Sequence, residues 1–289
     1  MTDADTLLDA LPGPTDLRLV VTDMDGTLLA PGGDVPDGLW PLLDAMRERG
    51  VVFSPASGRQ YATLARTFQH GTDGLDGMVL IAENGAYVVR DGEEVSSSPL
   101  DPAVVRDVVR HLRDAVAAPG ADLDLGIVVC GRETAYVERL DRAFLDHVDP
   151  YYASLERVDD VLAVLDAGEV VVKVAVWTSG DPEATTAPTL AGFRDAAQVV
   201  VSGSSWVDVM PLGVDKGVAV RRLQAELGVT PAQTAVFGDY LNDLEMLDAA
   251  ELSFAMVDAH PDVLARATHT APSHRDEGVL LVVRRLLGL

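Results

Sequence analysis

Short apolar runs alternate with helical periodicity through the first part of the chain. The runs cover residues 20–22, 51–53 and 78–82 and are rich in β-branched side chains. Between them, residues 39–49 and 60–69 repeat their apolar positions at the spacing of an α-helix. An order of strand, helix, strand, helix, strand predicts an α/β fold with a doubly wound, parallel sheet.

The pattern changes near Tyr87. Asp91-Gly92 stands between two short β-like runs and is typical of a hairpin turn. A helix is predicted over 102–116, followed by short strands and helices, the last of these helices over 181–197. We therefore expect an inserted α+β cap domain over residues 87–203. The core is then discontinuous, with residues 1–86 and 204–289, and its later strands and closing helix are predicted over 205–210, 234–237, 252–255 and from 278.

The first apolar run ends in two aspartates, Asp23 and Asp25, separated by one residue. Residues i and i+2 of an extended chain point the same way, so both carboxylates can converge on one bound group. Gly26 lets the chain turn sharply, and Thr27 supplies a hydroxyl. Two carboxylates repel each other, so the pair indicates a cation or a reaction at the carboxyl end of the strand, where open α/β sheets bind ligands.

The composition and charge of the chain exclude some classes of binding partner. The chain has 22 basic and 46 acidic residues and a formal net charge of −24. Such a surface repels nucleic acid and anionic membranes, and any phosphate site must be locally positive. Residues 1–16 look like a frayed leader without a secretory signal, and no apolar run is long enough to span a bilayer. The lone Cys130 fits a reducing cytoplasm.

Three further stretches carry polar groups at the ends of predicted elements. Ser57-Gly58-Arg59 and Asp215-Lys216-Gly217 each precede a helix, and each alone is typical of an ordinary cap beside a salt-bridged or solvated side chain. Gly238-Asp239-Tyr240-Leu241-Asn242-Asp243 is more specific. Asp239 ends a strand there, and Asn242 and Asp243 follow one helical turn later, so the three side chains can share a face.

Together, the four stretches resemble the motifs of the haloacid dehalogenase superfamily of phosphohydrolases. Residues 83–86, Glu-Asn-Gly-Ala, and the Lys-Gly pair at 216–217 are similar to the Cof-like, type IIB branch, which carries a large α+β cap. Ser57 stands where this branch often has Thr, which keeps the hydroxyl. Val257 and Asp258 replace the usual Gly and Asn, so a pocket wall of altered shape and charge is expected.

The resemblance implies phosphoryl transfer through an aspartyl-phosphate. Asp23 is then the nucleophile, and Asp25 is the general acid that later becomes the base. The implied cofactor is Mg²⁺, held by the Asp23 and Asp239 carboxylates and the Asp25 backbone carbonyl. The resemblance also implies phosphate binding by the Met24 N–H, Ser57, the Gly58 N–H, Lys216 and Asn242. Supporting roles are implied for Thr27, Arg59 and Asp243, and Asp243 would orient the ligands of the metal.

The sequence therefore predicts a cytoplasmic, Mg²⁺-dependent phosphatase of small phosphorylated metabolites, sugar phosphates first. No nucleic acid or membrane partner is expected. A phosphomutase or phosphotransferase of the phosphomannomutase kind remains open, because the motifs do not separate it from a hydrolase. A regulator that binds phosphometabolites without turnover is disfavoured because Asp23 and Asp25 are both present. The substrate, its contacts in the cap and the oligomeric state stay open.

Overall fold

Two neighbouring strands at the centre of a parallel sheet come from distant parts of the chain. The computed structural model describes residues 3–69 and 75–289. Strand β1 (Leu19–Thr22) pairs in parallel with β12 (Thr234–Gly238) on one side and with β2 (Val52–Pro55) on the other. The sheet order is β14-β13-β12-β1-β2, where β13 is Leu252–Met256 and β14 is His269–Ala271. The chain therefore leaves β1 and β12 in opposite directions, and the carboxyl ends of these two strands form a topological switch point.

Helices and apolar side chains bury this sheet. All four residues of β1 are buried, as expected for a parallel strand covered on both faces. Helix α8 begins where Asp215 accepts the Val218 N–H at 2.7 Å and ends at Gly228 in the left-handed conformation. The helices of this region are α1 (Asp3–Ala10), α2 (Leu39–Glu48), α3 (Tyr61–Thr67), α8 (Lys216–Leu227), α9 (Leu244–Leu247), α10 (Pro261–Arg266) and α11 (Gly278–Leu287).

A three-stranded antiparallel sheet continues this layer. It contains β3 (Val79–Ala82), β4 (Tyr87–Arg90) and β5 (Glu93–Ser97), and a bridge from Ala56 to Ile81 joins it to the chain just beyond β2. Tyr87 to Val89 lie in the same apolar cluster as β1. The hairpin expected inside the insertion is thus attached to the core.

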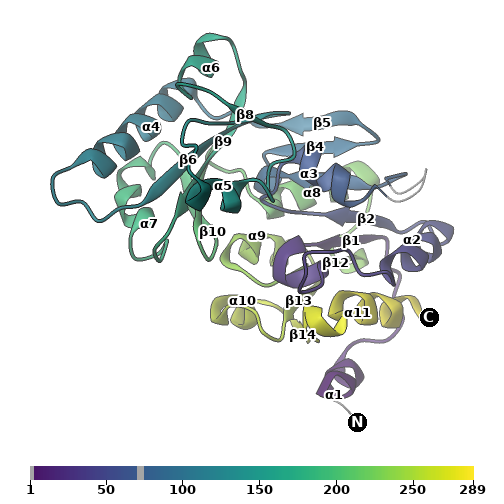
Figure 1. The fold of residues 1–289 in the computed structure, drawn as a ribbon. Coiled ribbons are helices and arrows are strands. Elements are labelled where there is room, and N and C mark those ends of the chain that lie inside the picture. Colours follow the sequence, from purple (N-terminus) through teal and green to yellow (C-terminus); the bar gives the residue numbers. More distant parts are fainter. Residues whose placement is uncertain (1–2, 70–74) are drawn as a thin grey trace.

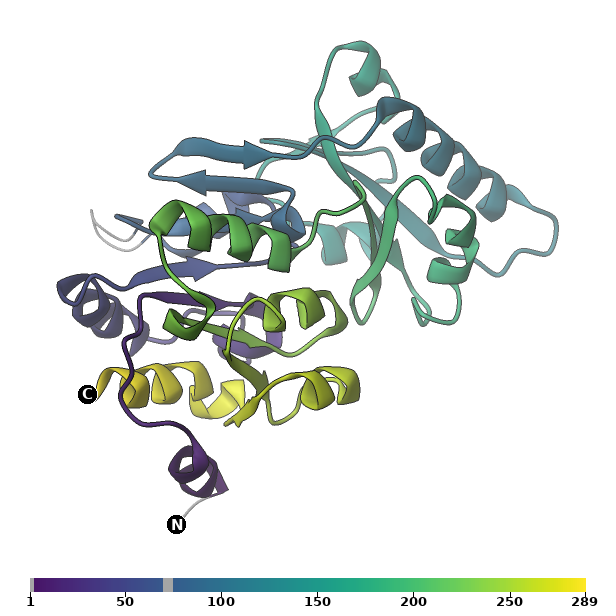
Figure 2. The same cartoon turned by 180° about the vertical axis from the view of Figure 1, so that it is seen from behind.

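A separate six-stranded sheet has the order β10-β11-β9-β6-β7-β8. We call residues 98–210, which contain it, the cap, and the rest of the chain the core. Figures 1 and 2 show this sheet and α4 in the upper part of the molecule, away from both chain ends. Its elements are α4 (Pro102–Ala117), β6 (Leu125–Gly131), β7 (Ala135–Val137), α5 (Arg142–Val148), β8 (Leu155–Arg157), α6 (Ala163–Asp166), β9 (Val171–Thr178), α7 (Thr186–Thr189), β10 (Gln198–Gly203) and β11 (Trp206–Met210).

The predicted fold class, a Rossmann-like core with an inserted α+β cap, is confirmed. The boundary between core and cap nevertheless differs from the expected one at residues 87 and 203. Strands β4 and β5 join the sheet of β3 and so belong to the core, whereas β11 pairs with β9 and so belongs to the cap. Of the helix predicted over 181–197, only the four-residue α7 and a short 3-10 turn at Ala191–Phe193 form, and Pro188 inside this segment lacks the N–H that a longer helix would need. Strands β8, β10 and β14 were not predicted.

Part of the predicted frayed leader, residues Asp3–Ala10, forms helix α1. Arg285 Nη2 donates to the Leu11 carbonyl at 3.0 Å, and Leu8 packs against the core cluster. Residues 1–2 of the predicted leader lie outside the described residues. Within the described chain, no helix has both the length and the apolar character needed to cross a membrane.

Candidate active site

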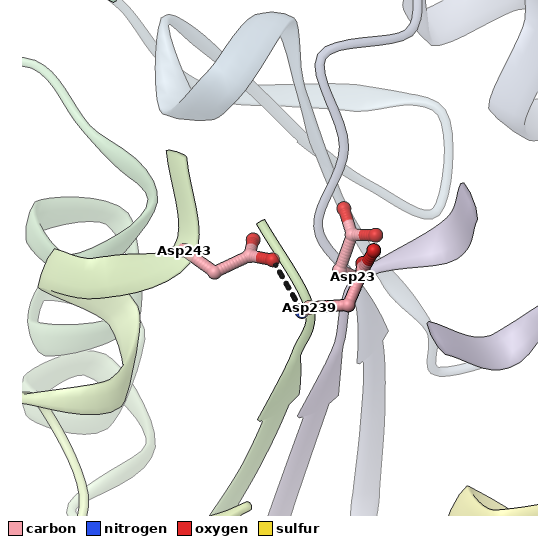
Figure 3. Close-up of side chains that lie close together, drawn as sticks. All are labelled: Asp23, Asp239 and Asp243. Atoms are coloured by element: carbon pink, nitrogen blue, oxygen red, sulfur yellow. Dashed lines mark hydrogen bonds between the residues drawn. The ribbon is translucent and has the colours of Figure 1, made fainter. Parts of the chain in front are cut away.

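The carboxyl ends of β1 and β12 bring Asp23 and Asp239 together. Asp23 follows β1, and its backbone N–H donates to the Phe237 carbonyl at 2.9 Å. Asp243, in a short helix after β12, completes a group of three carboxylates, and one oxygen from each lies within 4.8 Å of the others. Figure 3 shows the Asp23 and Asp239 side chains next to each other, with Asp243 on the far side of Asp239.

Lys216 joins two of these carboxylates. Its Nζ lies 2.5 Å from Asp23 Oδ1 and 2.7 Å from Asp243 Oδ1, and its side chain is completely buried. Burial alone would lower the pKa of Lys216, but the two carboxylates outweigh it and raise the pKa above the ordinary value. Lys216 is therefore a fixed positive charge beside the predicted nucleophile.

Asp243 organises the loop that carries Asp239. Its Oδ2 accepts the backbone N–H groups of Asp239 at 2.9 Å and Tyr240 at 3.1 Å, the first of which is drawn in Figure 3. Gly238 permits this approach, because a Cβ there would lie 2.6 Å from the Asp243 Cβ. Both oxygens of Asp243 are therefore engaged, Oδ1 by Lys216 and Oδ2 by the backbone of the loop that carries Asp239.

The three carboxylates form a group that could hold a metal ion. Burial, with repulsion from Asp243 and Asp239, raises the pKa of Asp23 well above its ordinary value. Burial and Asp243 raise the pKa of Asp239 to about 7. Thr27 Oγ1 donates to Asp239 Oδ1 at 2.8 Å and fixes that side chain. Crowded carboxylate oxygens of this kind are the donors that Mg²⁺ prefers, and a bound cation relieves their repulsion, so the residues fit the implied metal.

Asp25 is not part of this carboxylate cluster, although it lines the same cavity. Its carboxylate is half-exposed and pairs with Arg59, at 2.8 Å from Nε and 2.5 Å from Nη2. The Arg59 guanidinium in turn lies 5.3 Å from the ring centre of Tyr151, a cap residue. Arg59 therefore links the predicted general acid to the cap, a more specific position than its supporting role implied.

Of the predicted phosphate-binding residues, Ser57, Gly58 and Asn242 line the same cavity as Asp23, whereas Met24 and Lys216 are not part of its lining. Ser57 Oγ accepts the Arg59 N–H at 3.1 Å, in the loop before α3. Asn242 Nδ2 donates to Asn84 Oδ1 at 3.0 Å, and Met24 is fully buried in the turn after Asp23. A cavity of about 470 Å³ is lined from the core by Asp23, Asp25, Ser57, Gly58, Arg59, Asp239, Tyr240 and Asn242.

The cap contributes the other wall, which the sequence did not predict. Its lining residues are His147, Tyr151, Tyr152, Lys173, 202–206 and Asp208. A charged residue inside an otherwise apolar strand was the available signal for Lys173. Asp258, in contrast, lies outside the lining of this cavity as the structure describes it, and it accepts a hydrogen bond from Ser273 at 2.9 Å.

Comparison with known proteins places this chain in a protein family. The family described as haloacid dehalogenase-like hydrolase matches residues 20–283. The chain belongs to this family. The family and the enzyme class predicted from the motifs, a phosphoric monoester hydrolase of the haloacid dehalogenase type, are confirmed.

Several relatives cover nearly the whole chain. The 5-amino-6-(5-phospho-D-ribitylamino)uracil phosphatase of Escherichia coli strain K12 is 32% identical over 275 residues, which are 94% of this chain and 96% of the relative. A solved structure from Streptococcus mutans has a TM-score of 0.84 at 23% identity, covering 94% of this chain and 100% of that one. A subclass IIB sugar phosphatase has a TM-score of 0.76 at 18% identity, covering 91% and 96%. The two structures agree with this fold.

Proposed function

We propose that this hydrolase is a Mg²⁺-dependent phosphatase of small phosphorylated metabolites that works through an aspartyl-phosphate. The observation that carries the proposal is the buried Asp23, held by Lys216 and adjoining Asp239 at one end of a cavity. We also propose a cytoplasmic location, which fits the free, buried thiol of Cys130.

In the first step, an Asp23 oxygen attacks phosphorus, and the bond from phosphorus to the leaving oxygen breaks. Lys216 keeps one Asp23 oxygen in place, so the other is directed to the cavity. Asp23 and Asp239, with the Asp25 carbonyl, would hold Mg²⁺. The bound cation supplies positive charge that offsets the repulsion between these carboxylates and the phosphate.

Asp25 is the proposed proton donor and acceptor. In its protonated form it gives a proton to the leaving oxygen, and as a carboxylate it then takes one from the water that attacks the aspartyl-phosphate. Phosphate is released and Asp23 is regenerated. The ion pair with Arg59 keeps the Asp25 side chain at the cavity wall between these steps.

The phosphate oxygens are proposed to contact Ser57, Asn242 and the backbone N–H groups of Met24 and Gly58. Lys216 adds positive charge directly beside Asp23, in a protein whose net charge is otherwise strongly negative. These assignments follow the motifs, and their support is that Ser57, Gly58 and Asn242 share one cavity with Asp23.

The leaving group would face the cap. Sugar phosphates are the first proposed substrates, since the segment from Ser202 to Ser205 offers hydroxyl and backbone groups to a polyol. A second candidate is a polyol phosphate that carries a planar heterocycle. Tyr151 and Trp206 favour it, because their rings meet edge to face at 5.8 Å in the cavity wall, and the Escherichia coli relative is named for such a compound.

A phosphate-release screen tests the proposal. Purified protein with Mg²⁺ is incubated with sugar phosphates, nucleotides and 5-amino-6-(5-phospho-D-ribitylamino)uracil, with Asp23→Asn as the matched control. Phosphate release by the wild type alone is the expected result. Isomerised product without phosphate release would instead establish a phosphomutase, and saturable binding without turnover would establish a regulator.

A further inference from the structure

Lys173 is a buried cation in the middle of a cap strand. It lies in β9 between apolar neighbours and is 1% exposed. Its Nζ makes an ion pair with Glu83 Oε2 at 2.7 Å and lies 3.5 Å from Asp208 Oδ2. Glu83 belongs to the core, directly after β3, and is fully buried. One cap side chain therefore neutralises a carboxylate of the core.

The same ammonium group reaches the predicted phosphate loop. Lys173 Nζ donates to the Gly58 carbonyl at 2.6 Å. Asn84 Nδ2 donates to Asp208 Oδ2 at 2.5 Å, and Asn84 Oδ1 accepts from Asn242 Nδ2 at 3.0 Å. Two positions assigned to phosphate binding, Gly58 and Asn242, are thus connected to this cap cluster by hydrogen bonds.

Attachment of the cap to the core does not explain this cluster, because burying its charged groups costs desolvation free energy. Burial raises the pKa of Glu83 although Lys173 opposes the shift, and neither Glu83 oxygen has a well-aligned hydrogen-bond donor among the described residues. Buried ion pairs often contribute little net stability. Uncharged contacts already join the two parts, since Thr63 Oγ1 donates to the Tyr151 carbonyl at 2.8 Å and Gln60 Nε2 donates to the Ser154 carbonyl at 2.9 Å.

We propose that Lys173 is a positioning residue, through which the seated cap aligns Gly58 and Asn242 to receive the phosphate. The inference rests on the proposed function, which assigns these two positions to phosphate binding. When Lys173 is in place, its hydrogen bond holds the Gly58 carbonyl, which is joined to the Gly58 N–H through the α-carbon, and so restricts the orientation of that N–H. Asn84 and Asp208 fix the Asn242 amide. The phosphate cradle is therefore complete only with the cap in contact.

Lys173→Met tests this role, and Arg132→Gln is the matched control. Arg132 is also a cap cation that pairs with a core glutamate, Glu94 at 3.3 Å, but that pair is exposed. Affinity for inorganic phosphate is measured by calorimetry in Mg²⁺, together with kcat and KM for 4-nitrophenyl phosphate. Lys173→Met should lower phosphate affinity and kcat/KM about 10- to 100-fold, the range for groups that orient a binding site. Arg132→Gln should stay within about twofold of the wild type.

A double variant separates positioning from stability. Lys173→Met with Glu83→Gln removes the uncompensated carboxylate, so the melting temperature should recover while phosphate affinity stays low. If Lys173→Met alone does not fold, the phosphate affinity of the double variant is compared with that of the wild type instead. Recovery of phosphate affinity together with the melting temperature would overturn the proposal, as would unchanged affinity in Lys173→Met. A wild type that binds phosphate but hydrolyses nothing would refute the phosphatase proposal, and the affinity comparison would still decide the role of Lys173. A wild type that binds no phosphate would overturn both.

Discussion

Lys216 Nζ lies 2.5 Å from Asp23 Oδ1, so the candidate nucleophile carries its counter-charge within the protein. The second partner of Lys216, Asp243 at 2.7 Å, keeps the ammonium group in place even when Asp23 is altered. Substitution of Asp23 therefore changes the attacking atom and leaves the buried cation paired.

Asp23→Asn should abolish turnover while the fold persists. The amide keeps the shape of the side chain but lacks the attacking charge, so the rate should fall by several orders of magnitude. Phosphate release is measured together with the circular dichroism spectrum. Substantial activity in a preparation free of wild-type protein would refute the aspartyl-phosphate mechanism.

Asp25→Ala should affect substrates according to their leaving groups. An alkyl phosphate needs protonation of its leaving oxygen, so its rate should fall about 100- to 10,000-fold. An activated aryl phosphate needs less protonation and should lose less in the first half-reaction, which is read as the burst of released phenol. An equal loss for both substrates in that burst would exclude Asp25 as the general acid.

Chelation should remove activity, and Mg²⁺ should restore it. Ca²⁺ should compete for the site but support little turnover, because its larger and looser shell misplaces the reacting oxygens. Asp239→Ala should raise the Mg²⁺ concentration that gives half-maximal activity, measured in a Mg²⁺ titration of phosphate release. Full activity in excess chelator would contradict the metal assignment.

The metal-free protein should be more stable at mildly acidic pH. Burial and Asp243 raise the pKa of Asp239 to about 7, from an ordinary value of 3.8. The stability linked to its protonation is present below the unfolded pKa and is lost as the pH rises through about 7. In chelator, the melting temperature should therefore be higher at about pH 6 than at about pH 8, and the increase produced by Mg²⁺ should be larger at about pH 8. Asp239→Asn should flatten this difference, and a pH-independent Mg²⁺ effect in the wild type would contradict the shifted carboxyl group.

Gly217→Ala should destabilise the core strongly. A Cβ at Gly217 would lie 2.0 Å from the Glu245 carbonyl oxygen, so the first turn of α8 would be forced away from the chain after Asp243. Overpacking of this kind costs about 1–3 kcal/mol or more. Gly180→Ala is the matched control, since its nearest neighbour would be 3.7 Å away. The midpoints of urea unfolding are compared for the two variants. Equal midpoints would show that α8 and α9 can move apart without loss of stability.

The sequence by itself determined which catalytic candidates could meet. Asp23 and Asp239 each end an apolar, β-branched run, and parallel strands place such ends along one edge of a sheet whatever the rest of the chain does. The Lys-Gly pair at 216–217 likewise stands at a helix start, which local capping by Asp215 specifies. These features depend on neighbours a few residues away, so they could be predicted from local pattern and from the family's motifs.

Only the tertiary structure decided how the cap is divided from the core and how the two communicate. The hairpin of β4 and β5 and the strand β11 have local patterns that suit either sheet, and their membership depends on distant pairing with β3 and β9. In the sequence, Lys173 is a single charge in an apolar run, and its partner Glu83 lies in a distant part of the chain, directly after β3. A buried charge must find its counter-charge in three dimensions, so no local pattern of the sequence could identify that pair.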